Sequence, residues 1–117
     1  MRVYCCGPMR GYRDYNWPAF DRAKKHLQQL GYEVVSPADL DREDGLTCDM
    51  DPCDIDIRER LTRAVTAQLT CDEICLIKGW PYSLGAQAEL ALAKAAEMGI
   101  LYYNNGHVME MTHDLVR

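Results

Sequence analysis

The sequence predicts a small α/β domain built on a parallel sheet, and two observations carry that prediction. Short apolar runs alternate along the chain with longer segments of helical periodicity. The helical segments are long enough to carry the chain from one parallel strand to the next, which a hairpin turn is not. The chain has 117 residues, nearly half of them apolar, so we expect a single domain over residues 1–117.

The first part of the chain contains two expected strands with a helix between them. Residues 2–6 (RVYCC) read as a short buried strand. After a polar loop, Asn16 can cap a helix, and Gly31 ends it. Residues 32–36 (YEVVS) predict the second strand, which ends at Pro37.

A second helix is expected after a long acidic segment. Acids crowd residues 39–56, and the segment up to about residue 54 predicts a solvated loop. Either Asp54 or Asp56 can cap the helix that follows. The side chains expected on its inward face are Ile57, Leu61, Val65 and Gln68 or Leu69.

The last part of the chain repeats the strand and helix pattern. Residues 73–78 (EICLIK) predict a third strand and residues 79–83 a turn. Ser83 is a good N-cap for a third helix that ends near Gly99. Residues 100–103 (ILYY) predict a fourth strand, and the pattern from Asn104 onward is ambiguous.

Strands that alternate with helices in this way are typical of a parallel sheet covered on both faces. We therefore expect a small flavodoxin-like or Rossmann-like three-layer domain. Its sheet should be parallel, with about four to five strands and the first strand in a central position.

Composition narrows the function classes. The net charge of −5 argues against a partner that is a nucleic acid polymer. No stretch resembles a signal peptide or reaches membrane-spanning length, so we expect neither a membrane partner nor export, and a location in the cytoplasm. The six cysteines are then free thiols. The spacing of Cys48 and Cys53 fits no zinc knuckle, so no metal is expected.

Two loops should form the ligand site, because ligands bind beyond the carboxyl ends of parallel strands. The loop after the first strand carries Gly7, Arg10 and Gly11, which suit a phosphate group. The loop after the third strand leads into a helix N-terminus, which attracts anions. Neither loop is a dinucleotide or ATP motif, so no cofactor is expected. A plain turn with a surface arginine is the alternative.

Glu89 is the one acid in the segment GWPYSLGAQAELALAKA, residues 79–95. On a helix, its neighbours three and four residues away are small or apolar, so no cation pairs with it there. Partial desolvation would raise the pKa of this carboxyl group and make it a candidate reactive group. The alternative is a carboxylate that simply reaches solvent at the edge of an amphipathic helix.

Five motifs occur in register: VYCCGPMRGY, NWPAF, GYEVVSPADL, CDEICLIKGW and SLGAQAE. Together they resemble the nucleoside 2-deoxyribosyltransferase family, especially its small, often phage-encoded relatives, and also the 2'-deoxynucleoside 5'-phosphate N-hydrolases. The resemblance covers residues 2–101, and it implies that the cytoplasm is that of a bacterium or phage-infected cell. It implies a flavodoxin-like enzyme that cleaves the N-glycosidic bond of a nucleoside or its 5'-monophosphate, with no cofactor. Transfer of deoxyribose between bases is the close alternative.

The resemblance also implies residue roles. A glutamate at the position of Glu89 is the family's nucleophile, which attacks the anomeric carbon. The substrate-binding residues that it implies or suggests are Tyr4, Gly7, Pro8, Met9, Arg10, Gly11, Tyr12, Trp80, Ser83 and Gly85, with a place in the core as the alternative for Trp80. A homodimer or larger homo-oligomer is expected, with Tyr103 or Asn104 near the partner's site.

One position departs from the family. Relatives carry an aspartate in the second helix, and this chain has Ala64 there. An alanine cannot hydrogen-bond a hydroxyl group. Either Asp54 or Asp56 substitutes, or activity is weakened, or the protein is a non-catalytic nucleotide-binding module, such as a sensor or sponge. An engineered substitution is a further alternative.

Overall fold

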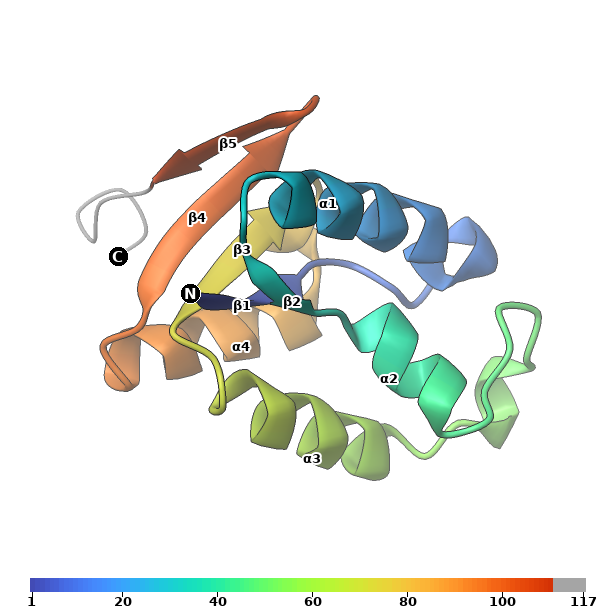
Figure 1. Ribbon diagram of the computed structural model, residues 1–117. Helices are drawn as coiled ribbons and strands as arrows, with labels where there is room; N and C mark the ends of the chain where they lie inside the picture. Colours follow the sequence, from blue (N-terminus) through green and yellow to red (C-terminus); the bar gives the residue numbers. More distant parts are fainter. Residues whose placement is uncertain (111–117) are drawn as a thin grey trace.

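The computed structural model describes residues 1–110, and its centre is a five-stranded sheet with strand order β2-β1-β3-β4-β5 (Figure 1). The strands are β1 (Arg2–Cys6), β2 (Glu33–Val35), β3 (Glu73–Ile77), β4 (Gly99–Asn104) and β5 (His107–Glu110). The first four run parallel, and β5 pairs antiparallel with β4.

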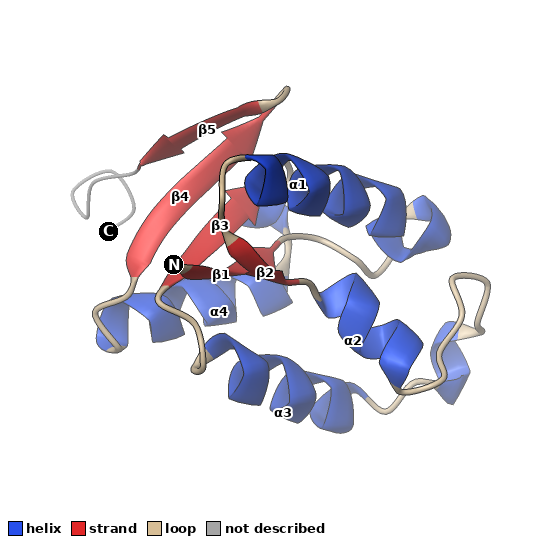
Figure 2. Ribbon diagram, in the orientation of Figure 1, coloured by secondary structure: helices blue, strands red, loops and turns tan. Residues whose placement is uncertain are grey.

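Helices cover both faces of the sheet (Figure 2). α1 (Trp17–Gln29) packs on one face, and α3 (Ile57–Gln68) and α4 (Leu84–Ala95) cover the other. α2 (Pro37–Glu43) follows β2 and contributes Ala38 to one core and Leu40 to the other. The predicted fold class, a three-layer α/β domain with a mostly parallel sheet, is confirmed.

β1 is an interior strand whose side chains alternate between the two cores. Val3 and Cys5 pack on the side of α1, and Tyr4 and Cys6 pack on the side of α3 and α4. All four side chains are fully buried. The first strand was expected in a central position. β1 does have a neighbour on each edge, but the middle strand of the five is β3.

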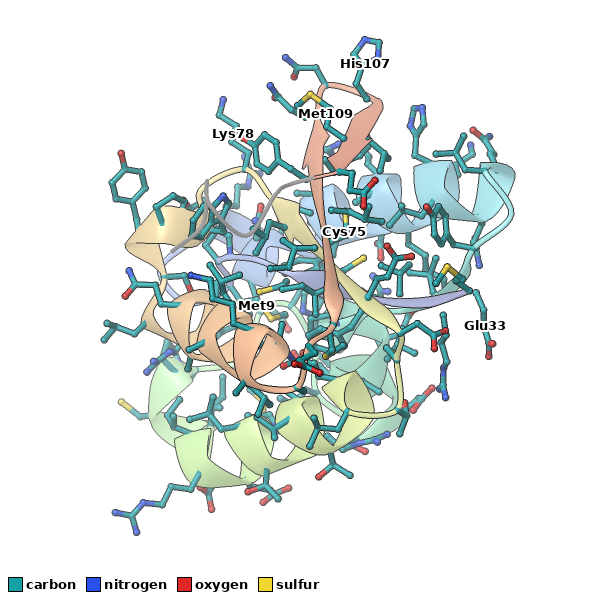
Figure 3. The ribbon with its side chains drawn as sticks, turned by 90° about the vertical axis from the view of Figure 1, so that its left-hand side faces the viewer. Met9, Glu33, Cys75, Lys78, His107 and Met109 are labelled. Carbon is teal, nitrogen blue, oxygen red and sulfur yellow. The ribbon has the colours of Figure 1, made fainter. Side chains whose placement is uncertain are left out.

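Four of the six cysteines are buried, as small apolar side chains usually are. Figure 3 shows Cys75 inside the molecule, with Glu33, His107 and Met109 at its periphery. Cys48 is partly exposed and Cys53 is exposed, and all six thiols are free.

The acidic segment is not the continuous solvated loop that its composition predicts. Pro37 begins α2 at a position where a fixed φ favours a helix, and Ser36 precedes it in an extended conformation. Arg42 of this helix pairs with Asp39 of the same helix and with Asp21 of α1. Charge pairing therefore neutralises acids that the sequence pattern assigns to water.

The start of α1 also differs from the prediction. Asn16 stands at the N-cap position with a left-handed backbone, and its side chain makes no cap bond. Its amide instead donates to the main-chain oxygen of Pro8, at 2.9 Å. This bond ties the loop after β1 to the beginning of α1.

The inward face of α3 is only partly the predicted one. Gln68 is buried, but Leu61 and Leu69 are 40% and 53% exposed. Ala67 is buried in their place. A helix at the edge of the sheet buries a narrow face, so the larger side chains are left at its margin.

The segment from Gly99 to Glu110, whose pattern is ambiguous from Asn104 onward, forms a hairpin. α4 ends at Ala95, earlier than expected, because Glu97 adopts a left-handed conformation and Gly99 already begins β4. Asn105 and Gly106 both have positive φ, as a tight hairpin turn requires, and this turn adds β5 to the sheet. Residues 111–117 of this ambiguous tail lie outside the described residues.

Over residues 1–110, none of the helices has both the length and the apolar character that a bilayer crossing requires.

Candidate active site

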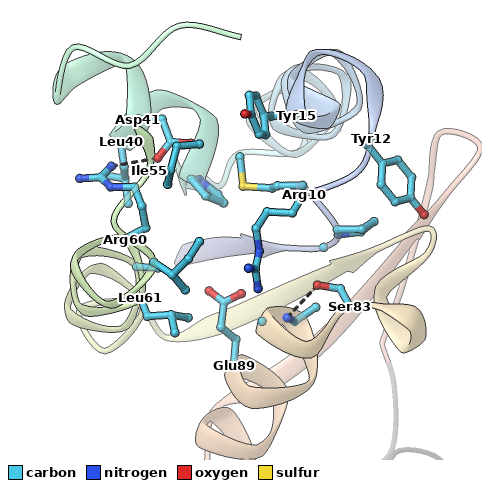
Figure 4. Close-up of a pocket in the computed structure, with 18 of the residues that line it drawn as sticks. Arg10, Tyr12, Tyr15, Leu40, Asp41, Ile55, Arg60, Leu61, Ser83 and Glu89 are labelled. Atoms are coloured by element: carbon cyan, nitrogen blue, oxygen red, sulfur yellow. Dashed lines mark hydrogen bonds and ion pairs between the residues drawn. The ribbon is translucent and has the colours of Figure 1, made fainter. Parts of the chain in front are cut away.

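A cavity of about 340 Å³ opens beyond the carboxyl ends of β1 and β3. Between these two strands the connections leave toward opposite faces of the sheet, and this is the place where open α/β sheets bind ligands. The loop after β1 and the start of α4 form one wall, and α2 and α3 form the other (Figure 4). The predicted residues that line the cavity are Tyr4, Gly7, Pro8, Met9, Arg10, Tyr12, Ser83, Gly85 and Glu89.

Glu89 lies six residues into α4 and is 7% exposed. Its Oε1 accepts a hydrogen bond from the Cys6 thiol at 3.7 Å, and its Oε2 has no hydrogen-bond partner among the described residues. Its main-chain oxygen accepts from the Gln68 side chain at 2.8 Å, which ties α4 to α3 at this point. No Lys or Arg of residues 1–110 forms an ion pair with Glu89.

Burial raises the pKa of Glu89 from its usual 4.5 to about 7. The Tyr4 hydroxyl and the Cys6 thiol oppose this rise as nearby hydrogen-bond donors. The pKa of Tyr4 is raised well above its ordinary value, first by burial and then by the charge of Glu89. The two side chains are thus close, although the Tyr4 hydroxyl does not reach hydrogen-bonding geometry with any described residue. The Tyr4 hydroxyl oxygen and Glu89 Oε2 are therefore two buried polar atoms at one side of the cavity without a hydrogen-bond partner among residues 1–110.

The corner of the cavity beside Glu89, at the start of α4, suits an anion. Ser83 Oγ accepts the Ala86 N–H at 3.2 Å and so begins α4, whose first N–H groups lie at the cavity. Arg10 is exposed and forms no ion pair within residues 1–110, and its guanidinium extends between Glu89 and Ser83 (Figure 4). Gly7 permits the close approach of this loop to β3, because a Cβ there would overlap Ile77.

The sequence interpretation missed Asp41 and Arg60, which line the other wall. Arg60 donates to Asp41 at 2.9 Å and to Asp44 at 2.7 Å, and the Asp41 and Arg60 side chains are only 17% and 16% exposed. Burial raises the pKa of Asp41, and Arg60 opposes the rise. The sequence does contain a signal for this helix, because Ser36-Pro37 is a typical helix start. It would have placed Asp41 on a helix.

Several predicted residues lie elsewhere. Gly11 and Trp80 do not line the cavity, and Trp80 packs against the core, which is the alternative that the sequence left open for it. Ala64 lines the cavity, as the family resemblance implies. Asp54 and Asp56 do not line it, and Asp56 caps α3 by accepting the Glu59 N–H at 3.2 Å. The alternative in which one of these two acids substitutes for the family's aspartate therefore finds no support.

Over residues 1–110, no three His, Cys, Asp or Glu side chains are arranged to hold a metal ion.

The raised pKa of Glu89 makes the folded state less stable as the pH rises. Between pH 4.5 and about 7 the folded chain keeps a proton that the unfolded chain has lost, so stability from this group is complete below this range and is lost through it. The loss is about 3 kcal/mol. We expect the substitution Glu89→Gln to remove this pH-dependent loss of stability. Urea unfolding at about pH 5 and about pH 8 should show the variant gaining roughly 2–3 kcal/mol over wild type between the two conditions. Parallel pH dependence of the two proteins would contradict this.

Comparisons with known proteins agree with this architecture. Residues 1–102 match the family described as "Domain of unknown function (DUF4406)". No curated protein matches the chain. Among solved structures, the chain is similar to a 2-deoxyribosyltransferase from the psychrotolerant bacterium Bacillus psychrosaccharolyticus. The TM-score is 0.58 at 20% identity, over 87% of this chain and 71% of that chain.

An identity this low carries an argument about fold alone. At that level the predicted resemblance to the nucleoside 2-deoxyribosyltransferases is confirmed, because the flanked parallel sheet superimposes over most of both chains. The chain belongs to the DUF4406 family and has the fold of a 2-deoxyribosyltransferase.

Proposed function

We propose that the protein cleaves the N-glycosidic bond of a nucleoside 5'-monophosphate or nucleoside, with Glu89 as the nucleophile. One observation carries this proposal: a carboxylate 7% exposed, without a cation partner among residues 1–110, borders a cavity of about 340 Å³. A structural carboxylate at such a depth would normally have a charge partner. The similarity to a solved 2-deoxyribosyltransferase agrees with chemistry on a nucleoside.

In the proposed reaction a Glu89 oxygen bonds to the anomeric carbon while the bond from that carbon to the base nitrogen breaks. The base leaves with the electron pair of that bond and takes up a proton. Water then attacks the glycosyl ester, which releases the sugar and restores Glu89. The nucleophile must be ionised, so its pKa of about 7 predicts that the rate rises with pH through neutrality.

The two ends of the cavity suggest how a substrate lies. Arg10, Ser83 and the N-terminus of α4 suit a 5'-phosphate, and Glu89 lies between that corner and the opposite wall (Figure 4). At that wall Leu40 and Leu61 offer apolar surface for the faces of a base. The Asp41–Arg60 pair offers polar atoms for its edge. The corner that suits a 5'-phosphate therefore favours a nucleoside 5'-monophosphate over a free nucleoside as the substrate.

The first test of this proposal is a panel of nucleosides and 5'-monophosphates with chromatography of released base. Wild type should release base over many turnovers. Glu89→Gln is nearly isosteric but cannot form the ester, so its turnover should fall by several orders of magnitude while ligand binding survives. Asp72→Asn is a suitable control, because Asp72 is exposed and away from the cavity. Equal turnover of Glu89→Gln and wild type would exclude the nucleophile.

The phosphate corner is tested by Arg10→Ala. Because a charge-assisted hydrogen bond contributes roughly 1.5–3 kcal/mol, monophosphate binding should weaken at least about tenfold. Nucleoside binding should change little. Isothermal titration measures both, and Arg13→Ala is a matched control because Arg13 is nearby and does not line the cavity. Equal losses for nucleoside and monophosphate would rule out a role in phosphate binding.

A non-catalytic nucleotide-binding module is the second candidate, and Ala64 in the cavity wall favours it. Ala64→Asp restores the carboxylate that the family resemblance expects. Under the enzyme proposal, the variant should release base faster than wild type, because the new carboxylate can hold a sugar hydroxyl. Base release by neither protein, together with stoichiometric monophosphate binding, would establish the module instead.

Transfer of the sugar to a second base is the alternative to hydrolysis, and the name of the solved neighbour favours it. Added free base would then give a new nucleoside.

We also propose a homodimer or larger homo-oligomer, because Tyr82 and Leu84 are highly exposed at the border of the cavity. A neighbouring copy would cover them.

A further inference from the structure

The thiol of Cys6 is the one side-chain group of residues 1–110 that forms a hydrogen bond with the Glu89 carboxylate. Cys6 is the last residue of β1 and is fully buried on the side of α4. Its Sγ lies 3.7 Å from Glu89 Oε1 and 3.5 Å from the main-chain oxygen of Ala86. Both acceptors belong to α4, three residues apart, so the thiol sits against one turn of the helix.

A thiol carries one proton and can donate it to one of these acceptors at a time. An ionised carboxylate is the stronger acceptor, and a protonated carboxyl group the weaker one. The thiol should therefore turn toward Glu89 when Glu89 is ionised and toward Ala86 when it is not. Burial, followed by the charge of Glu89, raises the pKa of Cys6 well above its ordinary value, so the donor proton is kept throughout the neutral range.

We propose that Cys6 is a positioning residue for Glu89, whose thiol holds Oε1 of the carboxylate and favours its ionised form. The effect of Cys6 on turnover rests on the proposed function, but its effect on the titration of Glu89 does not.

Of the other groups of residues 1–110 that face Glu89, the Tyr4 hydroxyl of β1 also lowers its pKa as a nearby donor. It lacks hydrogen-bonding geometry, so the hydrogen bond to the carboxylate comes from Cys6. From the loop after β1, Arg10 extends toward the carboxylate without forming an ion pair (Figure 4). From α3, Gln68 bonds the main chain of Glu89 and not its carboxylate. Arg60, also on α3, is paired with Asp41 and Asp44.

The direct test titrates Glu89 by carbon NMR of the side-chain carboxyl group, with the signal assigned by its loss in Glu89→Gln. In Cys6→Ala the midpoint should move upward by about 0.5 to 1 pH unit, because a donor to the charged form is gone. Cys6→Ser keeps a donor and should restore the midpoint toward or below the wild-type value. Cys5→Ala is the matched control. Cys5 precedes Cys6, is equally buried and faces the other core, so its loss should leave the midpoint unchanged.

The rate profile gives the second readout. At acidic pH, Cys6→Ala should turn over about three- to tenfold more slowly than wild type, and the two should converge at high pH. An unchanged midpoint in Cys6→Ala would overturn the proposal, even with Glu89 confirmed as the nucleophile. A shifted midpoint in a protein that releases no base would support the role of Cys6 and refute the proposed function.

A third measurement needs no change at Cys6, in case its variants do not fold. The infrared S–H stretching band reports how strongly a thiol donates. In the wild type one band should shift as the pH passes through about 7, when Glu89 ionises. The same band should stay constant in Glu89→Gln. A pH-independent band in both proteins would overturn the proposal.

Discussion

The burial of β1 on both faces and along both edges is the constraint on which the rest of the structure depends. Its neighbours β2 and β3 occupy its two edges, and α1 and the α3–α4 pair cover its faces. Because side chains alternate along a strand, Tyr4 and Cys6 are then directed to the side of α4. The chain leaves β1 at Gly7, in close contact with Ile77, and the cavity begins there.

The same arrangement explains why Glu89 lowers the stability of the folded state and is at the same time a reactive carboxylate. α4 packs on the sheet through small and apolar side chains such as Ala86, Leu90 and Ala93, and Glu89 is carried into that interface with them. Burial then raises its pKa to about 7. A poorly hydrated carboxylate is less stable in its charged form and more reactive for the same reason. The thiol of Cys6 partly offsets the cost.

The opposite wall of the cavity is organised by charge as well as by apolar packing. α2 and α3 meet through Arg60 and Arg63, which bind carboxylates of the segment from Asp41 to Asp44. These pairs connect α3 to α2, while Ala67 and Gln68 hold α3 to the core and to α4. The cavity thus lies between one wall on the sheet and one in which ion pairs join two helices.

The sequence by itself determined the order of the main strands and helices, because periodicity and cap residues are local signals. It also singled out Glu89, since a lone acid among small residues is visible without a structure. The hairpin at Asn105-Gly106 and helix α2 carried local signals too, but an acidic composition and a short ambiguous tail obscured them.

Only the tertiary structure decided which side chains meet. Cys6 and Glu89 are 83 residues apart in sequence, and Asp41 and Arg60 lie on different helices. Whether Trp80 enters the cavity or the core depends on how α4 begins against the sheet. The pKa of Glu89 likewise depends on depth of burial, which no neighbouring residue in the chain specifies. Contacts of this kind arise when distant segments pack together, and a local pattern holds no information about them.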